Sequence, residues 1–588
     1  MMRLINTYRA YLLISLVFLF QCTSKETQQD QNPFSSLREN YMGKLSGIEK
    51  CMDQLIEGNA YRSNLSTARQ LFKEVEVVMA FTEASDYKSL NKPNILIVKE
   101  EDQTDIKIAD PLSFQVLEEE IYAENPDSAV VKNSAEFIKG RMQFLMRNTS
   151  FSHYKNYHFL WMIRKGIIRV ATTGITGFDS PVLANSLNEA KLVYKSIDEM
   201  ISLFSANFKD DDLLQQWRSE IQATIKDLDG DFDTFDRFAF IKNHTNKQIN
   251  LWNLTVEDWQ VEFPLTLSLN NHFASLFSAE AFNPVHFSDR RADVGNQAKI
   301  VLGRKLFNDQ SLSKDGKMSC ATCHDKAKAF TDGLKLSKGQ LRNSPTLTYA
   351  GLQKAFFYDN RAGSLEGQIV SVINSETEFH TSVEEITGKV GSNVEYSTAF
   401  DSLYKDGVTD HNIRNAMANY IRSLAPFNSK FDRNIRGEEE TLTSLEVQGF
   451  NIFMGKGSCA TCHFPPVFNG TVPPEFADTE MELIGTPETA ANKEVDDDAG
   501  RFNIFKTKER KFFFKTPTVR NVSLTAPYMH NGVYESLDQV MDFYNNGGGA
   551  GMGFNVPLQT LPFDSLGLTN DEQKAVIAFM ETLTDQSD

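Results

Sequence analysis

The sequence Cys-Ala-Thr-Cys-His occurs at residues 320–324 and, unchanged, at residues 459–463. The reactive side chains are Cys320, Cys323 and His324 in the first copy, and Cys459, Cys462 and His463 in the second. Two thiols at this spacing can bond to the two vinyl groups along one edge of a haem, and the adjacent histidine can then bind the iron. A single copy would also fit a thiol redox pair or half of a zinc site. Two complete copies predict two covalently attached c-type haems.

Both copies lie within the same local arrangement, in which a helix precedes the motif and a loop-rich stretch follows it. The arrangement occurs at 295–324 and again at 443–463. Capping boxes begin the second of these helices and a final amphipathic helix, at Thr443 with Glu446 and at Thr569 with Glu572. Short helices around a haem, closed by a C-terminal helix, are typical of a cytochrome c fold. We therefore predict haem domains at 276–440 and 441–588.

The N-terminal half has a different sequence pattern: residues 37–275 are predicted to form mostly long amphipathic helices. Apolar residues return every three or four positions, for example over 65–81 and 186–208. The predicted fold class is therefore mainly α: a helical N-terminal domain followed by two cytochrome c-like haem domains. Parts of this half resemble the imelysin-like helical family, whose His-x-x-Glu metal motif reads Gln115-x-x-Glu118 here. Without the histidine, we expect a helical bundle without a metal.

The first residues indicate export. Two arginines precede an apolar run at 10–20, which is too short to cross a membrane as a helix, so we predict a signal peptide over 1–21. The residues around Cys22 resemble the lipobox of bacterial lipoproteins, although Gln21 replaces the usual small residue. We expect a lipidated Cys22, a flexible tether over 22–36 and a periplasmic protein held to a membrane only by its lipid. The alternative is an ordinary signal peptide, an incidental Cys22 and a soluble periplasmic protein.

Composition limits the partners. The chain has 588 residues and a formal net charge of -18, which makes nucleic acid an unsuitable partner and a basic or neutral protein a better one. Hydrophobic residues make up 41% of the chain, enough for several cores. Of six cysteines, four belong to the two motifs, so the pattern is no disulfide framework. Cys51, in a helical stretch, is expected to be a small buried apolar residue.

The chain from about 285 to 585 strongly resembles the bacterial dihaem cytochrome c peroxidase family, including its MauG branch. Besides the haem motifs, the matching stretches are AFTDG at 329–333, RNSPTL at 342–347, YDNRA at 358–362, LEGQ at 365–368, KTPTVRN at 515–521, TAPYMHNG at 525–532 and FYN at 543–545. The resemblance implies two-electron reduction of hydrogen peroxide to water. It also implies a one-electron donor, such as a small cytochrome c, that delivers electrons to the second haem.

Three other functions remain open. A MauG-like enzyme would use peroxide to oxidise residues of a partner protein. A dihaem electron-transfer cytochrome would relay single electrons without chemistry on peroxide. The N-terminal helical domain would, separately, dock a partner or organise a complex.

The resemblance assigns roles around the first haem. His324 would be the iron ligand, and Gln368 and Glu378 would line the peroxide pocket. A carboxylate there can carry a proton from the inner to the outer oxygen of peroxide, so that water leaves. Glu376 is the nearest competitor for this role. Standard peroxidases place a second histidine after the first motif, but none occurs between His324 and Pro345, so the first haem is expected to be open, as in the MauG branch.

The second haem would be held by His463 on one side. Standard peroxidases place a methionine fourteen residues after the histidine that corresponds to His530. That position is Tyr544 here, and the MauG branch also has tyrosine there. A phenolate ligand should lower the iron's reduction potential relative to a thioether. In the alternative reading, Tyr544 is an ordinary core residue and Met541 or Met552 is the ligand.

Two further expectations concern the space between the haems. The tryptophan that the family places there reads Tyr358 in this chain, which would relay electrons less readily. The family also binds calcium between the haems. The resemblance implies a side-chain oxygen of Asn343 and backbone oxygens of Thr525 and Pro527 as its ligands, which are the hard oxygen donors that calcium prefers.

Overall fold

A computed structural model describes residues 32–588 except 101, 103, 289–293 and 587–588. The expected signal peptide and Cys22 therefore lie outside the described residues. Helices dominate the described part, where the strands form two small antiparallel sheets: β1 (Ile97–Glu100) pairs with β2 (Ile106–Ala109), and β3 (Met481–Glu482) pairs with β4 (Phe514–Lys515). The prediction of a mainly α fold is confirmed. Within the described residues, no helix combines the length and apolarity needed to cross a bilayer.

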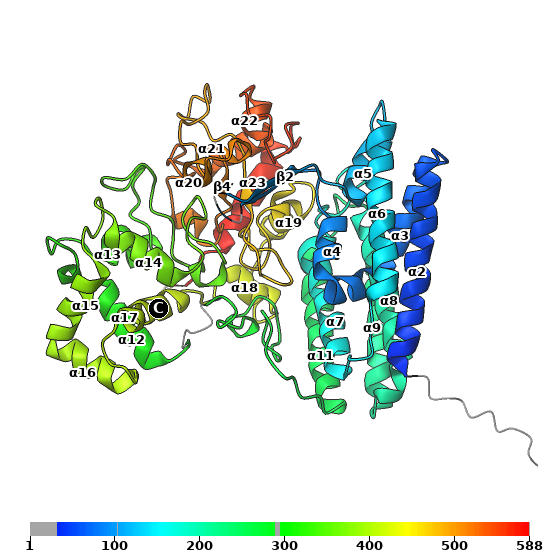
Figure 1. Cartoon of the computed structure of the whole chain (residues 1–588), viewed down its shortest axis with the longest axis horizontal. Helices are drawn as coiled ribbons and strands as arrows, with labels where there is room; N and C mark the ends of the chain where they lie inside the picture. The colour runs from blue at the N-terminus through cyan, green and yellow to red at the C-terminus, as the bar shows by residue number, and fades with distance from the viewer. Residues whose placement is uncertain (1–31, 101, 103, 289–293, 587–588) are drawn as a thin grey trace, which may run out of the picture.

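The helical region, which we define as α2 to α11, contains long helices that run side by side (Figure 1). They are α2 (Pro33–Ile56), α3 (Tyr61–Thr82), α6 (Ser128–Asn148), α7 (Asn156–Arg169), α8 (Ser186–Leu203), α9 (Asp211–Asp227) and α11 (Asn246–Asp258). Shorter elements join them: α4 (Ala84–Leu90), α5 (Phe114–Tyr122), α10 (Arg237–Phe240) and two π-helices, η1 (Val170–Gly174) and η3 (Ile241–Thr245). Apolar stripes at helical spacing are buried, and Cys51 is buried in α2 as expected.

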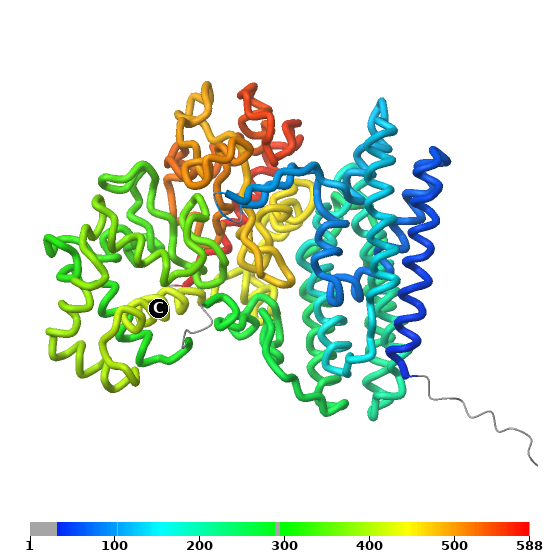
Figure 2. The backbone as a smooth tube through the Cα atoms, in the orientation of Figure 1, coloured from blue at the N-terminus to red at the C-terminus, as the bar shows by residue number. Residues whose placement is uncertain are grey.

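The first motif domain, α12 to α17, lies at the end of the molecule far from α2, and the backbone trace shows the second motif domain, α18 to α23, between them (Figure 2). The first contains α12 (Gln297–Phe307), α13 (Cys320–Cys323), α14 (Leu365–Asn374), α15 (Val383–Ser392), α16 (Val394–Leu403) and α17 (Asp410–Arg422). The second contains α18 (Lys430–Ile435), α19 (Ser444–Met454), α20 (Phe502–Phe505), α21 (Leu537–Asn545), α22 (Gly548–Gly551) and α23 (Asn570–Thr582). Both predicted capping boxes are present, at the starts of α19 and α23.

The two motif domains share one helix crossing. In each, the helix before the motif crosses the last helix of the domain at a glycine. A Cβ on Gly303 of α12 would collide with the carbonyl oxygen of Ala416 in α17, and a Cβ on Gly449 of α19 would collide with that of Ala575 in α23. An aromatic residue follows four positions later in both partner helices, Tyr420 and Phe579. The two motif domains thus share this crossing, and their predicted bounds stay a prediction.

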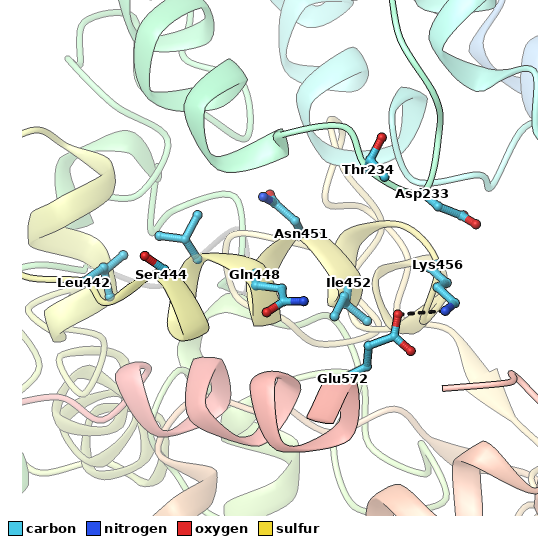
Figure 3. A pocket seen from close by; sticks show the side chains of 10 residues that line it. Asp233, Thr234, Leu442, Ser444, Gln448, Asn451, Ile452, Lys456 and Glu572 are labelled. Atoms are coloured by element: carbon cyan, nitrogen blue, oxygen red, sulfur yellow. Dashed lines mark hydrogen bonds and ion pairs between the residues drawn. The ribbon is translucent and has the colours of Figure 1, made fainter. Parts of the chain in front are cut away.

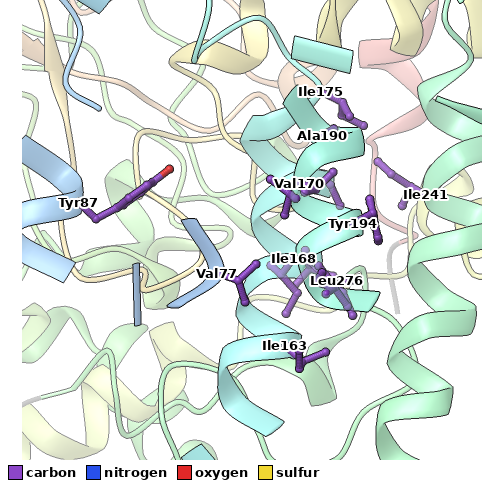
Figure 4. Close-up of a cluster of buried hydrophobic side chains, with 14 of the residues drawn as sticks. Val77, Tyr87, Ile163, Ile168, Val170, Ile175, Ala190, Tyr194, Ile241 and Leu276 are labelled. Atoms are coloured by element: carbon purple, nitrogen blue, oxygen red, sulfur yellow. The ribbon is translucent and has the colours of Figure 1, made fainter. Parts of the chain in front are cut away.

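The clusters of buried apolar side chains do not follow the division of the chain into a helical region and two motif domains. One continuous cluster of buried apolar side chains runs through the helical region and the second motif domain and also includes Tyr349 and Leu352 of the first motif domain. The other buried apolar side chains of the first motif domain form a cluster of their own. Figure 4 shows part of the shared core, with Val170, Tyr194 and Ile241 gathered among the helices. Across the junction, the ring of Phe238 packs at 6.0 Å from that of Phe431. The helical region is thus packed onto the second motif domain as one body.

Candidate functional site

The first motif forms the single helical turn α13. Ser319 and Thr322 form a capping box at its start, and the Ser319 N–H donates to the Thr322 hydroxyl at 3.0 Å. No disulfide joins any of the five described cysteines. Burial raises the pKa of Cys320 to about 12 and that of Cys323 to about 11. Thiol redox pairs work through a lowered thiol pKa, so these neutral thiols do not fit that alternative.

Each motif histidine is oriented by a backbone carbonyl. His324 Nδ1 lies 3.0 Å from the carbonyl oxygen of Phe330, and His463 Nδ1 lies 3.0 Å from that of Pro517. Because a carbonyl only accepts, Nδ1 carries the proton and donates it, which leaves the Nε2 lone pair for a metal. Burial lowers the pKa of both histidines and keeps them neutral. Paired free thiols beside such a histidine fit a covalently bound haem at both sites.

The turn after α14 brings Glu378 to the first motif. The Glu378 N–H donates to the carbonyl oxygen of Ser375 at 3.1 Å. Glu378 is half-buried, and burial raises its pKa, which the Ser375 hydroxyl and Arg361 partly offset. Its charge in turn contributes to the raised pKa of both cysteines of the first motif, so it lies near them. Glu376, the competing acid, is exposed.

Gln368 belongs to the same segment. It is half-buried on α14, whose start is capped by the Ser364 hydroxyl accepting from the Gly367 N–H at 3.1 Å. The hydrogen bonds of the described residues do not join Gln368 to Glu378. The joint role of the two side chains therefore stays a prediction.

Tyr358 lies where the two motif domains meet. Its hydroxyl donates to the side-chain oxygen of Asn343, and its carbonyl oxygen accepts from the Lys515 N–H of β4 at 2.7 Å. Its ring centroid is 6.5 Å from that of His530, which in turn stacks on Phe514 at 3.8 Å. A side chain in contact with both motif domains is well placed for the relay position that the resemblance assigns to it.

The expected calcium ligands come together only in part. Asn343 Nδ2 donates to the carbonyl oxygens of Pro527 at 3.0 Å and Met529 at 2.7 Å. Asn343 and Pro527 are thus neighbours, whereas no described hydrogen bond joins Thr525 to either of them. Among the residues that the structure describes, no three His, Cys, Asp or Glu side chains are grouped to hold a metal ion. The expected ligand set uses amide and carbonyl oxygens instead, so the calcium site stays a prediction.

Tyr544 of α21 lies near the cysteines of the second motif. Tyr544 is half-buried, and its phenol pKa is raised first by burial and then by the charges of Cys462, Cys459 and Glu482. Met541 is buried in the core shared with the helical region, and Met552 is half-buried against the cluster that contains Phe543. The structure thus places Tyr544 near the motif cysteines, and the choice of Tyr544, Met541 or Met552 as the iron ligand stays a prediction.

Glu482 is a candidate that sequence reasoning missed. It lies on β3, half-buried beside Cys462 and Thr560, and burial raises its pKa to about 7. Repulsion by Glu480 adds to the shift, and Arg510 opposes it. An acid in a loop-rich stretch, outside every motif, carries no sequence signal of this kind. Contacts with distant segments hold it there: β3 pairs with β4, and the Leu483 N–H donates to the Thr560 hydroxyl at 3.1 Å.

A surface pocket lies elsewhere, between the helical region and the helices α19 and α23 (Figure 3). Asp233, Asn451, Lys456 and Glu572 are among its lining residues, and Lys456 Nζ lies 2.7 Å from Glu572 Oε1. None of the predicted site residues lines this pocket. It is therefore separate from both haem motifs.

Comparison with known proteins gives a consistent set of relatives. The family model for di-haem cytochrome c peroxidase matches residues 297–440. Cytochrome-c peroxidase IdrP2 of Denitromonas iodatirespirans is 34% identical over 317 residues, which cover 50% of this chain and 83% of that protein. The methylamine utilization protein MauG of Paracoccus denitrificans is 32% identical over 360 residues, covering 52% of this chain and 92% of that protein.

A further relative and one solved structure are also similar to this chain. Cytochrome c551 peroxidase of Nitrosomonas europaea is 30% identical over 331 residues, covering 55% of this chain and 91% of that protein. The crystal structure of a MauG-like protein associated with microbial copper homeostasis is 26% identical, covers 51% of this chain and 92% of its own, and superposes with a TM-score of 0.46. The repeated haem motif, the matched family model and relatives above 30% identity lead to one conclusion: the chain belongs to the dihaem cytochrome c peroxidase family.

Proposed function

We propose that this chain is a peroxidase that reduces hydrogen peroxide to two waters, consuming two protons and two electrons. The electrons come one at a time from a c-type cytochrome or a similar donor. The observation that carries the proposal is the half-buried Glu378 beside the first motif, because an acid/base group near a haem edge is what peroxide cleavage requires. The haems, held through thioethers of the two motifs, would supply iron that binds peroxide and exchanges single electrons.

The protein's own residues would divide the remaining work. His324 and His463 each present Nε2 to an iron. Glu378 takes the proton from the near oxygen of peroxide and returns it to the far one, and its raised pKa helps it to hold that proton in transit. Gln368 would orient peroxide through its amide. Tyr358, which contacts both motif domains, would carry electrons from the second site to the first.

The remaining parts of the proposal concern assembly and place. Asn343, Thr525 and Pro527 would hold a calcium ion between the motif domains. Asn343 and Pro527 are neighbours, and both oxygens would exchange their present hydrogen bonds for the ion. Lipidated Cys22 would attach the protein to a membrane from the periplasm. The chain would divide into a helical domain at 37–275 and haem domains at 276–440 and 441–588.

One observation favours a second function. Tyr544 lies close enough to Cys462 and Cys459 for their charges to influence its pKa, which supports it as the ligand of the second haem. The MauG branch shares this tyrosine, so a peroxide-dependent oxidase that acts on a partner protein is the alternative. A plain electron-transfer cytochrome has less support, because it has no use for Glu378.

The test uses the full chain with both haems attached. Turnover of hydrogen peroxide would be measured with a reduced small cytochrome c as donor, and absorption spectra of the oxidised protein would be recorded before and after peroxide. The proposal expects steady donor oxidation and a high-spin first haem without prior reduction. Spectral change without donor oxidation would favour the MauG-like function. Absence of both would leave the electron-transfer cytochrome and overturn the proposal.

A further inference from the structure

The helical region contacts the second motif through its π-helix. The π-helix η1 packs against the turn at Cys459–Thr461. Just beyond η1, the ring of Phe178 meets that of Phe464 edge-on at 6.1 Å, and Phe464 directly follows His463. π-helical turns cost backbone hydrogen bonding and occur frequently at functional sites. Here the irregular turn packs directly against a haem motif.

A second contact reaches the helix before the motif. Arg237 is fully buried, and its Nε donates to the carbonyl oxygen of Ile175, the residue after η1, at 2.8 Å. Its guanidinium lies against Gly455 at the end of α19, where any Cβ would collide with it. The neighbouring Phe238 N–H donates to Asn451 of α19 at 3.0 Å, and Figure 3 shows Asn451 pointing from α19 toward the helical region. The same arginine thus touches both the π-helix loop and α19.

A buried cluster of charged side chains lies at the base of the segment 170–178, which contains η1 and Phe178. Its charged members are all at most 5% exposed: Arg69, Lys73, Glu76, Arg169, Asp179 and Glu189. Arg169 directly precedes η1 and Asp179 directly follows Phe178, and the two are paired at 2.7 Å. Lys73 adds a second ion pair to Asp179 at 2.6 Å. The pair of Arg169 with Asp179 therefore fastens the two ends of the loop 170–178.

The pKa of Asp179 is consistent with a permanent ion pair to Arg169. Burial alone would raise the pKa of Asp179, but Arg169 and Lys73 hold it well below its usual range. Asp179 is thus a charged group in the interior of a helical bundle. Charges are costly to bury, and an apolar contact would hold a bundle together as well. A cluster kept at this cost, at the base of one loop, suggests that the shape of the loop matters.

We propose that the helical region is a positioning domain for the second haem: the Arg169–Asp179 pair fixes the loop 170–178, which supports the segment 459–464 and so sets the orientation of His463. The inference rests on the assignment of the second motif as a haem site, which the proposed function also uses. It gives a role to the half of the chain that the peroxidase reaction does not employ. Asp179 and Phe178 are positioning residues in this scheme, acting only through the segment that they support.

The test compares Asp179→Asn and Phe178→Ala in the full, haem-loaded chain. The readouts are the midpoint potential and the electron paramagnetic resonance spectrum of the second haem, recorded without peroxide. A loosened His463 should broaden the spectrum and change the reduction equilibrium about tenfold, which is about 59 mV for one electron. The spectrum of the first haem should not change. Phe178→Leu should restore most of the wild-type behaviour, because it keeps apolar volume against Phe464.

Glu220→Gln is the matched control. Glu220 is 2% exposed in the same region and pairs with His244 at 2.7 Å, but its partners do not belong to the 170–178 loop. This variant should lose thermal stability and keep the wild-type potential. An equal shift in Glu220→Gln, or a folded Phe178→Ala with the wild-type potential and spectrum, would overturn the inference. Peroxide turnover of the wild type is measured separately, so an inactive protein whose potential still responds to Asp179→Asn would refute the peroxidase and keep the positioning role.

Discussion

Replacing Glu378 by glutamine tests the chemistry at the first haem most directly. The substitution keeps the shape and polarity of the side chain but removes its ability to take up and return a proton. Glu378 is half-buried, and burial is the main cause of its raised pKa, so bulk water is poorly placed to substitute for it. The two motif cysteines that it influences should still attach haem, because glutamine introduces no new charge beside them.

The size of the effect follows from the role. A positioned acid/base group contributes about 10² to 10⁴ in rate, which corresponds to about 3 to 5 kcal/mol of barrier. We expect kcat to fall within that range in Glu378→Gln. The raised pKa also fixes the pH dependence. The carboxylate form is lost as the pH falls through this pKa, so wild-type kcat/KM should begin to decline at a higher pH than it would with an ordinary glutamate. The acidic decline due to Glu378 should be absent from the pH profile of the variant.

The assay is steady-state peroxide reduction with a saturating one-electron donor, at matched haem content. Glu376→Gln is the control, because Glu376 is two residues away and exposed, and its replacement should change kcat less than about twofold. The high-spin absorption of the first haem should persist in both variants. Wild-type turnover with an unaffected Glu378→Gln would refute the assignment of this acid. Equal losses in both variants would show that charge near the site, and not proton transfer, is what matters.

Four other outcomes are expected. Asp432→Asn should lower the free energy of unfolding by about 3–5 kcal/mol in urea denaturation, because Arg520 would be left charged without its ion-pair partner where both side chains are 0% exposed. The control Asp410→Asn breaks a surface ion pair and should lower it by less than about 1 kcal/mol. Gly449→Ala should destabilise by at least about 1–3 kcal/mol through its collision with Ala575, whereas Gly140→Ala, with open space around it, should not. Glu482 ionises near its pKa of about 7, so the midpoint potential of the second haem should fall between about pH 6 and pH 8 in the wild type and stay flat in Glu482→Gln, as followed by spectroelectrochemistry. Cys22→Ser should move the protein from the membrane fraction to the soluble periplasm, and unchanged fractionation would refute the lipid anchor.

Local patterns in the sequence predict local structure well. The capping boxes at Thr443 and Thr569 begin α19 and α23, and the periodic stretch at 65–81 lies within α3. The stretch predicted as helix over 186–208 is shorter in the structure, because α8 ends at Leu203 and a 3₁₀ turn at Ser205–Asn207 follows. Such signals are readable because each depends on residues within one or two turns of each other.

The rest of the site depends on contacts between distant residues. Asp179 pairs with Lys73 across 106 positions, and Arg501 pairs with Glu100 across 401. The sequence around one partner therefore does not predict the other. Glu482 is held near the second motif by segments far along the chain, through the pairing of β3 with β4 and the bond of Leu483 to Thr560. The preference for Glu378 over Glu376 comes from spacing within a family, and the structure adds a physical difference in burial. Functional side chains can be predicted from the sequence when one motif contains them. They cannot be predicted when only the fold brings distant residues into contact.

The continuous core has a practical consequence for dissecting the protein. A chain cut near residue 276 would keep both haem motifs and lose Phe238, leaving the faces of Phe431 and Phe450 open to water. Large apolar faces of this kind promote aggregation. The first motif domain has its own core and is the better candidate for isolated expression. Removing the helical region, or exchanging it for another bundle, would therefore require new apolar partners for the exposed face of the second motif domain.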